Sequence, residues 1–216
     1  VTDEILQEQG MTMDKEGFDK AMASQKERAR KARNDKEGRP VMYDTRSLHL
    51  EGLTVDEASK EGVVAALYQE GETTPIKEGH TGDSLAIILT NTAFHAEGGG
   101  QLGDTGRLIS DAGIFDVENT KKLPDGTTIH LGTVESGAFS VGQAVTFEVN
   151  LDRKADIARN HTATHLLHAA LKKVLGGHVN QAGSYVGPDR LRFDFSHFSP
   201  LTAEEVSRVE DLVNEA

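Results

Sequence analysis

Glycine is concentrated in the middle of this 216-residue sequence, and that distribution constrains the fold more than any other feature. Fifteen of the 22 glycines lie between Gly52 and Gly142, where they separate short apolar runs. Short runs divided by turn residues are typical of an all-β barrel or sandwich. Asp111-Ala112-Gly113 and Asp125-Gly126 provide turn chemistry between neighbouring runs. We therefore expect strands over 62–70, 84–90, 106–110, 114–118, 127–134 and 144–150.

The segments on either side of this region have a helical period. We expect a short helix over 2–9, and a longer one from Asp14 to about Asn34 with a thin apolar stripe. The period becomes helical again at Asp152 and continues to Gly176-Gly177, which would end the helix.

The sequence pattern of the last part of the chain predicts a hairpin and a final helix. Strands are expected over 180–186 and 191–196, joined by a Gly187-Pro188-Asp189 turn, and Thr202-Ala203-Glu204-Glu205 is a capping box that begins a helix. That helical pattern is unfinished at Ala216, so we expect a segment of a larger protein. The predicted class is α+β: short N-terminal helices over 1–51, a glycine-rich β-barrel over 52–151, and a helix plus antiparallel hairpin over 152–216.

Composition excludes several classes of function. The chain has no cysteine, which excludes disulfides, thiolate catalysis and cysteine-ligated metal within it, and favours a reducing, cytoplasmic setting. No apolar run reaches the roughly 18 residues of a membrane span. The net charge of −12 argues against a general DNA binder, and residues 52–150 carry most of the excess acid, with 5 basic and 15 acidic residues. Any nucleic-acid contact is therefore expected on the flanks, where six basic residues between Lys26 and Lys36 indicate either a solvated connector or an RNA-contacting helix.

The most informative stretch is a histidine-rich one in the third predicted helix. His161 and His165 lie one turn apart, so their Cβ atoms are expected about 5–6 Å apart on one face. One zinc ion could accept a nitrogen from each ring at about 2.0–2.1 Å. A zinc protease would need a glutamate directly after the first histidine, and Thr162 stands there. His168 is a candidate third ligand; alternatively, hydrogen bonds satisfy all three imidazoles.

A triple glycine, Gly98–Gly100, follows a predicted strand and precedes Gln101. Ordering three consecutive glycines is entropically unfavourable, so their bare backbone is expected to serve a purpose. One purpose is close approach of a ligand, with backbone N–H groups and the Gln101 amide as its partners. The alternative is a barrel corner or bulge, which also requires glycine.

Three motifs together resemble alanyl-tRNA synthetases over essentially the whole chain. They are Phe94-His95-Ala96-Glu97-Gly98-Gly99-Gly100-Gln101 followed by Gly103-Asp104-Thr105-Gly106, then Arg159-Asn160-His161-Thr162-Ala163-Thr164-His165-Leu166-Leu167-His168, and Gln181-Ala182-Gly183-Ser184 continuing to Leu191-Arg192-Phe193-Asp194-Phe195. The resemblance implies that residues 1–51 connect to a preceding synthetase domain and that 152–216 begin an editing core. It also implies a parent enzyme that attaches alanine to tRNA(Ala) with ATP and Mg²⁺, in an aminoacylation domain that this sequence does not include.

The activity implied for this region is hydrolysis of the ester in mischarged Ser-tRNA(Ala) and Gly-tRNA(Ala). The need for it is physical, because a pocket made for a methyl side chain cannot strongly reject glycine or serine. The mechanism expected is attack by water on the ester carbonyl, with zinc polarising an ester oxygen or positioning the terminal ribose. The alternatives are a non-catalytic tRNA-docking module and a freestanding trans-editing deacylase.

The same resemblance assigns the site residues. His161 and His165 match the first zinc pair of the family, whereas the second pair, C-x-x-x-H, has no counterpart here, so an incomplete zinc site is expected. Gln101 and Thr92 are the predicted catalytic residues, with Thr92 reading the serine hydroxyl, and both bind substrate together with Gly98, Gly99 and Gly100. The partner implied is the acceptor end of tRNA(Ala), without a membrane. The candidates for its phosphates, unless they form a solvated face, are Arg153, Lys154, Arg159, Lys172 and Lys173.

Overall fold

The computed structural model describes residues 14, 17–18, 20–22, 24–25, 43, 45, 54–56 and 58–216. The chain divides into two compact units, Val1–Met42 and Tyr43–Ala216. In the first unit the described residues from Gly17 to Gln25 are helical, as predicted, and the Gly17 N–H donates to the Asp14 carboxylate at 2.9 Å. The helix predicted over 2–9 and the basic residues from Lys26 to Lys36 lie outside the described residues.

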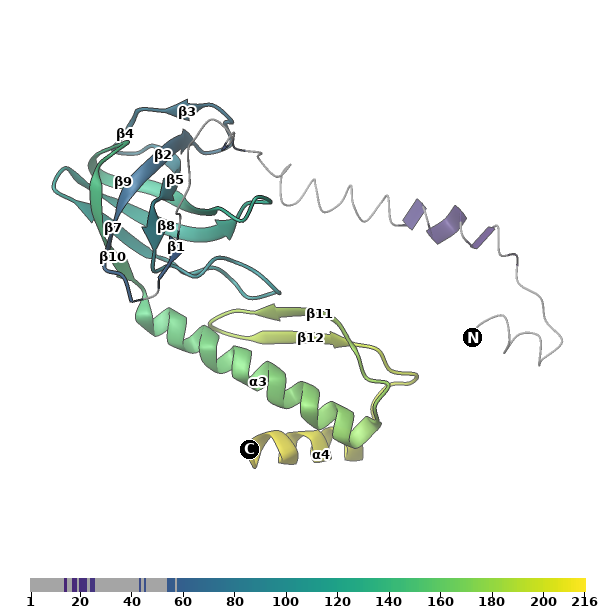
Figure 1. Ribbon diagram of the computed structural model, residues 1–216. Helices are drawn as coiled ribbons and strands as arrows, with labels where there is room; N and C mark the ends of the chain where they lie inside the picture. Colours follow the sequence, from purple (N-terminus) through teal and green to yellow (C-terminus); the bar gives the residue numbers. More distant parts are fainter. Residues whose placement is uncertain are drawn as a thin grey trace. The chain divides into compact units, whose positions relative to one another are not determined.

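A closed antiparallel barrel forms most of the second unit (Figure 1). Strand β10 pairs with both β7 and β2, and this double pairing closes a ring in the order β10-β7-β8-β9-β5-β2. The shorter strands pair at its margins: β3 with β2, β4 with β9, and β1 in parallel with β6. Their bounds are β1 Thr54–Val55, β2 Glu61–Gln69, β3 Pro75–Ile76, β4 Glu78–His80, β5 Ser84–Leu89, β6 Asn91–Thr92, β7 Gly106–Ser110, β8 Gly113–Lys122, β9 Thr128–Ser140 and β10 Ala144–Val149.

The six longer strands are those that the sequence predicts, but β8 and β9 extend further than expected. The expected ends lie at residues 118 and 134, whereas β8 continues to Lys122 and β9 continues to Ser140. In the structure Gly137 has φ +74°, and the β8–β9 register shifts twice. A Cβ at Gly137 would lie 1.9 Å from the Ala112 carbonyl oxygen, so this position requires glycine. Gly137 pairs with Gly113 beside the first register shift, and β9 continues through it.

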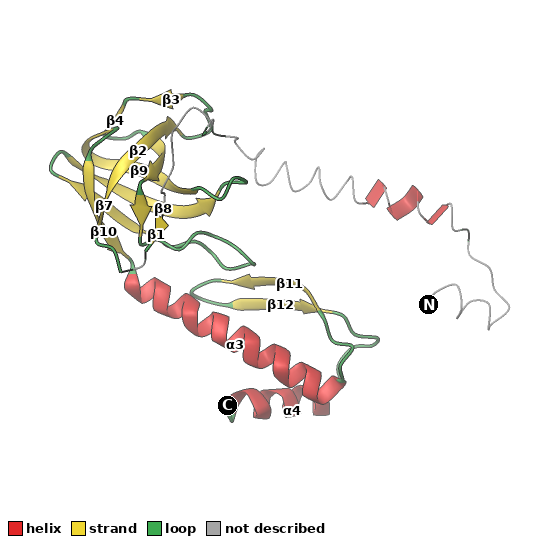
Figure 2. Cartoon of the chain, viewed as in Figure 1, coloured by secondary structure: helices red, strands yellow, loops and turns green. Residues whose placement is uncertain are grey.

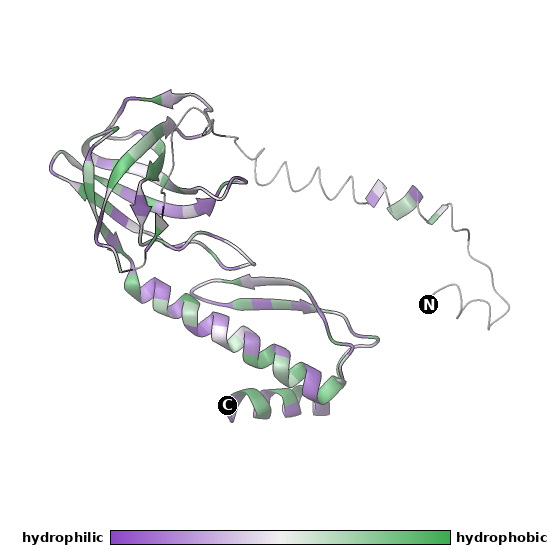
Figure 3. Ribbon diagram, in the orientation of Figure 1, coloured by the Kyte–Doolittle hydropathy of each residue, from purple (hydrophilic) through white to green (hydrophobic). Residues whose placement is uncertain are grey.

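The barrel core follows from the alternation of apolar and polar residues along the strands (Figure 3). One cluster, including Leu67, Leu85 and Phe115, is completely buried, and β5 is buried from Leu85 to Leu89. The opposite faces of β2 and β5 contribute Tyr68 and Ile88 to a second cluster. Strand β5 is therefore apolar on both faces and reads as a continuous apolar run in the sequence.

A helix, a hairpin and a second helix follow the barrel (Figure 2). They are α3 (Leu151–Leu175), β11 (Gln181–Val186), β12 (Leu191–Phe195) and α4 (Ala203–Asn214). The Asn150 side chain caps α3 by accepting from the Arg153 N–H at 3.0 Å, and the predicted capping box at Thr202 begins α4. A separate apolar cluster that includes Leu171, Val179 and Val209 holds these elements together. Sheet and helices are thus largely segregated along the chain, compatible with the predicted α+β class.

Candidate functional site

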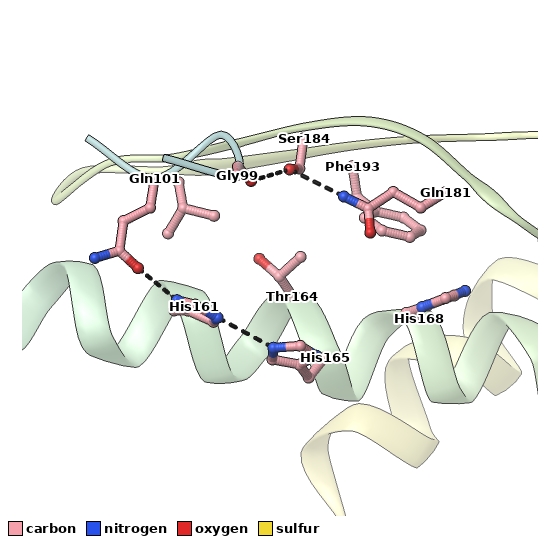
Figure 4. A pocket seen from close by; sticks show the side chains of 10 residues that line it. Gly99, Gln101, His161, Thr164, His165, His168, Gln181, Ser184 and Phe193 are labelled. Carbon is pink, nitrogen blue, oxygen red and sulfur yellow. Dashed lines mark hydrogen bonds between the residues drawn. The ribbon is translucent and has the colours of Figure 1, made fainter. Parts of the chain in front are cut away.

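A small pocket lies where the glycine-rich loop after β6 meets α3 and the β11–β12 hairpin (Figure 4). Its volume is about 120 Å³. Because about 10–15 Å³ of such volume is enough to hold one water, the pocket has room for several waters or for a small chemical group. Ten residues line the pocket, and seven of them have polar side chains: Gly99, Gln101, His161, Thr164, His165, His168, Gln181, Ser184, Val186 and Phe193.

The predicted histidine pair lies on one wall of this pocket. The Nε2 atoms of His161 and His165 are 3.1 Å apart, and the rings stack with their centroids at 5.0 Å. Two nitrogens that each lie 2.0–2.1 Å from a tetrahedral zinc ion are separated by about 3.3 Å. The pair therefore has close to the separation that two ligands of one zinc ion require.

Gln101 contacts His161 directly (Figure 4). Its Oε1 lies 2.5 Å from Nδ1 of His161. Because a carbonyl oxygen only accepts, Nδ1 carries the hydrogen, and the lone pair of Nε2 is directed toward His165. A partner on the second ring nitrogen is what orients a metal-binding histidine and fixes its tautomer. Gln101 is therefore placed to orient the His161 ring.

His168 lies on the same helix but does not join the pair. Its ring packs against Phe193 at a centroid distance of 5.0 Å and extends along α3 away from His165 (Figure 4). Its Nε2 is buried without a hydrogen-bond partner among the described residues. No group of three or more histidine, aspartate or glutamate side chains that could hold a metal occurs within the part of the chain that the structure describes. The third ligand suggested by the sequence is therefore not found at His168.

The triple glycine docks the loop onto the hairpin. Gly100 has φ +88°, and a Cβ there would lie 2.4 Å from the Ser184 carbonyl oxygen. The Val186 N–H donates to the Gly100 carbonyl at 2.7 Å, and the Ser184 hydroxyl donates to the Gly99 carbonyl at 2.9 Å. The three glycines were predicted to allow another group to approach the loop closely. In the structure, that group is the backbone of the hairpin.

The loop still offers two backbone donors. The Gly98 and Gln101 N–H groups bond to each other's carbonyls at 3.1 and 2.9 Å. The N–H groups of Gly99 and Gly100 have no partner among the described residues, and both glycines are exposed. Of the three glycines predicted to bind substrate, only Gly99 and Gly100 have backbone N–H groups without a partner among the described residues; the substrate-binding role itself stays a prediction.

Thr92 is not part of the pocket lining. Its side chain is 3% exposed, its Oγ1 lies 2.8 Å from Nε2 of His130, and it accepts the Phe94 N–H at 3.1 Å. Nδ1 of His130 lies 3.1 Å from the Ile87 carbonyl and must donate to it, so the Thr92 hydroxyl donates to Nε2. Complete burial lowers the pKa of His130 to about 4, which keeps the ring neutral. The single hydroxyl proton of Thr92 is thus already donated to His130, and its role as the serine reader stays a prediction.

The predicted phosphate contacts divide into two groups. Arg153 Nη1 donates to the Gly103 carbonyl at 2.7 Å, Lys154 Nζ lies 2.9 Å from Asp104 Oδ2, and Arg159 pairs with Asp156. Those three cations have partners within the chain. By contrast, Lys172 and Lys173 are exposed in the last turn of α3.

Several pocket residues were not predicted as site residues. Gln181, Ser184 and Phe193 belong to sequence runs noted for their resemblance to the family, but no periodicity indicates that they face the histidines. All three residues belong to the β11–β12 hairpin. The hairpin lies beside the glycine-rich loop only because of the tertiary fold, which the sequence pattern does not indicate.

Comparison with known proteins gives the class and then the relatives. A family of class II tRNA synthetases, described as tRNA synthetases class II (A), matches residues 1–153, and the chain belongs to this family. Among curated proteins, an alanine–tRNA ligase of Bacillus velezensis is 45% identical to this chain. The match covers 100% of this chain and 25% of that protein. It is 44% identical to the alanine–tRNA ligase of Bacillus subtilis, again over 100% of this chain and 25% of that protein. The ligase of Aromatoleum aromaticum is 43% identical over 99% of this chain and 24% of that protein.

The chain therefore spans about a quarter of the length of the curated relatives it matches.

Among the helices described by the structure, none combines the length and the apolar character that crossing a membrane demands.

Proposed function

We propose that this chain is the editing region of an alanine–tRNA ligase and that it hydrolyses the ester of Ser-tRNA(Ala) and Gly-tRNA(Ala). The observation that carries the proposal is the pair of imidazole nitrogens 3.1 Å apart in a pocket that also contains the glycine-rich loop. Attachment of alanine with ATP and Mg²⁺ would belong to other regions of the whole enzyme.

The chemistry would use zinc, held in part by Nε2 of His161 and of His165. When bound, zinc would supply a Lewis acid that polarises an ester oxygen or positions the terminal ribose. Gln101 would keep the His161 lone pair directed at the metal. The free N–H groups of Gly99 and Gly100 would donate to the tRNA 3' end or to the developing oxyanion. The exposed Lys172 and Lys173 are the better candidates for phosphate contacts.

A second candidate is a tRNA-docking module without hydrolytic activity. The observation that favours it is the lack of a third metal ligand among the described residues, since a zinc site needs three or four. The two candidates make different demands on the histidines. Hydrolysis requires the pair to bind metal, whereas docking does not.

The test is deacylation of labelled Ser-tRNA(Ala) by this chain and by the whole ligase, with Ala-tRNA(Ala) as the cognate control. Both proteins are measured with added zinc and with a chelator. We expect zinc-dependent hydrolysis of Ser-tRNA(Ala) by the whole ligase, and weak or no hydrolysis by this chain with its incomplete zinc site. The activity of the whole ligase should be lost in His165→Ala and retained in His80→Ala, an exposed histidine of the barrel. Equal rates for His165→Ala and the parent protein would contradict the proposal. Tight tRNA binding without hydrolysis in either protein would favour the docking module.

A further inference from the structure

Two contacts, two helical turns apart, join α3 to the loop that carries Gln101. Near the start of the helix Lys154 Nζ lies 2.9 Å from Asp104 Oδ2. Further along, Nδ1 of His161 lies 2.5 Å from Gln101 Oε1. Lys154 and His161 are seven residues apart, which places them on one helix face about 10 Å apart along the axis. Both partners belong to one short loop, because Gln101 and Asp104 are three residues apart.

The Asp104 end of this linkage is rigid and buried. The Asp104 side chain is 2% exposed, and Oδ2 also accepts the His95 N–H at 2.9 Å. The Asp104 N–H in turn donates to the His95 carbonyl at 2.8 Å, so backbone and side chain are both held by the loop. A buried carboxylate is unfavourable unless a positive charge compensates it. The buried Asp104 carboxylate therefore favours the placement of the loop along α3 at which Lys154 reaches it.

This pair differs from the surface ion pairs of the same unit. Arg107 and Glu135 are 48% and 47% exposed, and such pairs contribute little to structure. Lys154 is 28% exposed, and its ammonium group is directed to the carboxylate. The neighbouring Arg153 donates to the Gly103 carbonyl at 2.7 Å, which adds a second bond between the same turn of α3 and the same loop.

We infer that Lys154 and Asp104 are positioning residues, whose ion pair fixes the glycine-rich loop along α3 so that Gln101 reaches His161. Without the ion pair the loop would keep the Arg153 bond and its contacts with the hairpin, but the buried carboxylate would lose its cation. The loop would then shift along the helix, and Nδ1 of His161 would lose its acceptor. The ring would then sample both tautomers, and Nε2 would no longer be held ready to bind a cation. The consequence for catalysis rests on the proposed editing function, whereas the linkage between the two contacts does not.

The test compares Lys154→Met, which keeps the apolar stem and removes the charge, with Lys172→Met, an exposed lysine of the same helix. Nitrogen NMR spectra of the histidine rings report the tautomer of His161, and competition titration with a chelator reports zinc affinity. We expect Lys154→Met to lose the Nδ1–H preference of His161 and about 10-fold or more in zinc affinity. Lys172→Met should match the parent protein in both, and Lys154→Arg should restore both.

The double variant Asp104→Asn/Lys154→Met separates positioning from stability. Removing both charges relieves the uncompensated carboxylate, so this variant should fold even where Lys154→Met alone does not. It should still lose the tautomer preference. A folded variant without Lys154 that keeps the His161 tautomer would overturn the inference, as would weaker tRNA binding with an unchanged tautomer, which would make Lys154 a phosphate contact. If the parent protein binds no zinc, the metal proposal fails, and the tautomer still decides the positioning role.

Discussion

The carbonyl oxygen of Gln101 determines which nitrogen of His161 carries a proton, so removing it should weaken metal binding. Gln101→Leu keeps the approximate shape of the side chain and removes the acceptor. We expect zinc affinity to fall about 10–100-fold, the range found for partners of metal-binding histidines. Competition against a chromophoric chelator measures the change, and Gln69→Ala, an exposed position at the end of β2, is the control. Equal affinities of Gln101→Leu and the parent protein would show that His161 needs no orienting partner.

Comparing alanine substitutions at Gly99 and Gly100 tests why these positions of the loop are glycine. Both have positive φ, +60° and +88°, but only at Gly100 would a Cβ meet another chain segment, at 2.4 Å from the Ser184 oxygen. Gly99→Ala should lower the free energy of unfolding by about 1 kcal/mol through backbone strain. Gly100→Ala should lower it by about 3 kcal/mol or more, because the loop must also move off the hairpin. Urea unfolding measures both, and similar losses would mean that the hairpin contact contributes nothing.

His130 should make stability depend on pH between neutrality and pH 4. Its pKa is about 4 in the folded chain and about 6.5 when unfolded, so the unfolded state binds the extra proton in that interval. The stabilisation is complete above pH 6.5 and declines by about 3 kcal/mol as the pH falls to 4. The pKa values of Asp125 and Glu205 are lowered from 3.8 and 4.5 by hydrogen bonds with Thr45 and with Thr202 respectively, so their contributions are lost as the pH falls below those ordinary values.

The measurement is urea unfolding of the parent protein and His130→Gln at pH 7, 6 and 5. The glutamine side chain has no proton to gain in this range, so the variant should be less stable at pH 7 but show a flatter pH dependence. Parallel curves for the two proteins would indicate that another group causes the acid sensitivity.

At the residue level, the sequence predicts partners only where they are close along the chain. The helical period alone brings His161 and His165 together. The role of Gly100 depends on Ser184, and the hydroxyl of Thr92 is taken by His130, 38 residues away. Such contacts depend on how the barrel closes and on where the hairpin returns, and neither is encoded in local spacing. The resemblance to the family singles out these segments, but it does not predict which of their atoms have partners within the chain.

Among the secondary-structure elements, the capping box of α4 is open to a direct test. The Glu205 N–H donates to the Thr202 hydroxyl at 3.3 Å, and the Glu205 carboxylate accepts the Thr202 N–H at 2.8 Å. Thr202→Ala should lower the free energy of unfolding by about 1 kcal/mol, as found for other helix N-caps. Ser207→Ala, at an exposed position within the same helix, should have little effect. Urea unfolding compares them, and equal stabilities would mean that α4 is held by packing alone.

The element boundaries show where local signals suffice. Strand β7 was predicted at its observed bounds, Gly106–Ser110, because glycine-containing turns limit it on both sides. The strands β1, β3, β4 and β6 were not predicted, since segments of two or three residues become strands only through the partner they meet. Strand β9 was predicted too short, because its pairing with β8 continues past a register shift and through Gly137, which pairs with Gly113.

On the scale of the whole unit Tyr43–Ala216, two apolar cores are joined by polar contacts. The barrel clusters and the cluster of α3, α4 and the hairpin share no residue. What crosses between the two parts includes the Lys154–Asp104 pair, the His161–Gln101 bond and the Val186–Gly100 bond. Apolar burial is the dominant stabilising term in folding, so each core should set the stability of its own elements.

Leu171→Ala tests this division. Leu171 is buried with Ala170 and Val209, and loss of its side chain should destabilise the helical part by about 2–5 kcal/mol. If the cores are independent, amide hydrogen exchange will accelerate in α3, α4 and the hairpin while β2 and β5 keep their protection. Phe115→Ala, within the barrel core, should have the converse effect on the strands. Equal loss of protection in both parts for either variant would mean that the polar contacts make a single cooperative unit, and stabilising one core would then also stabilise the pocket between them.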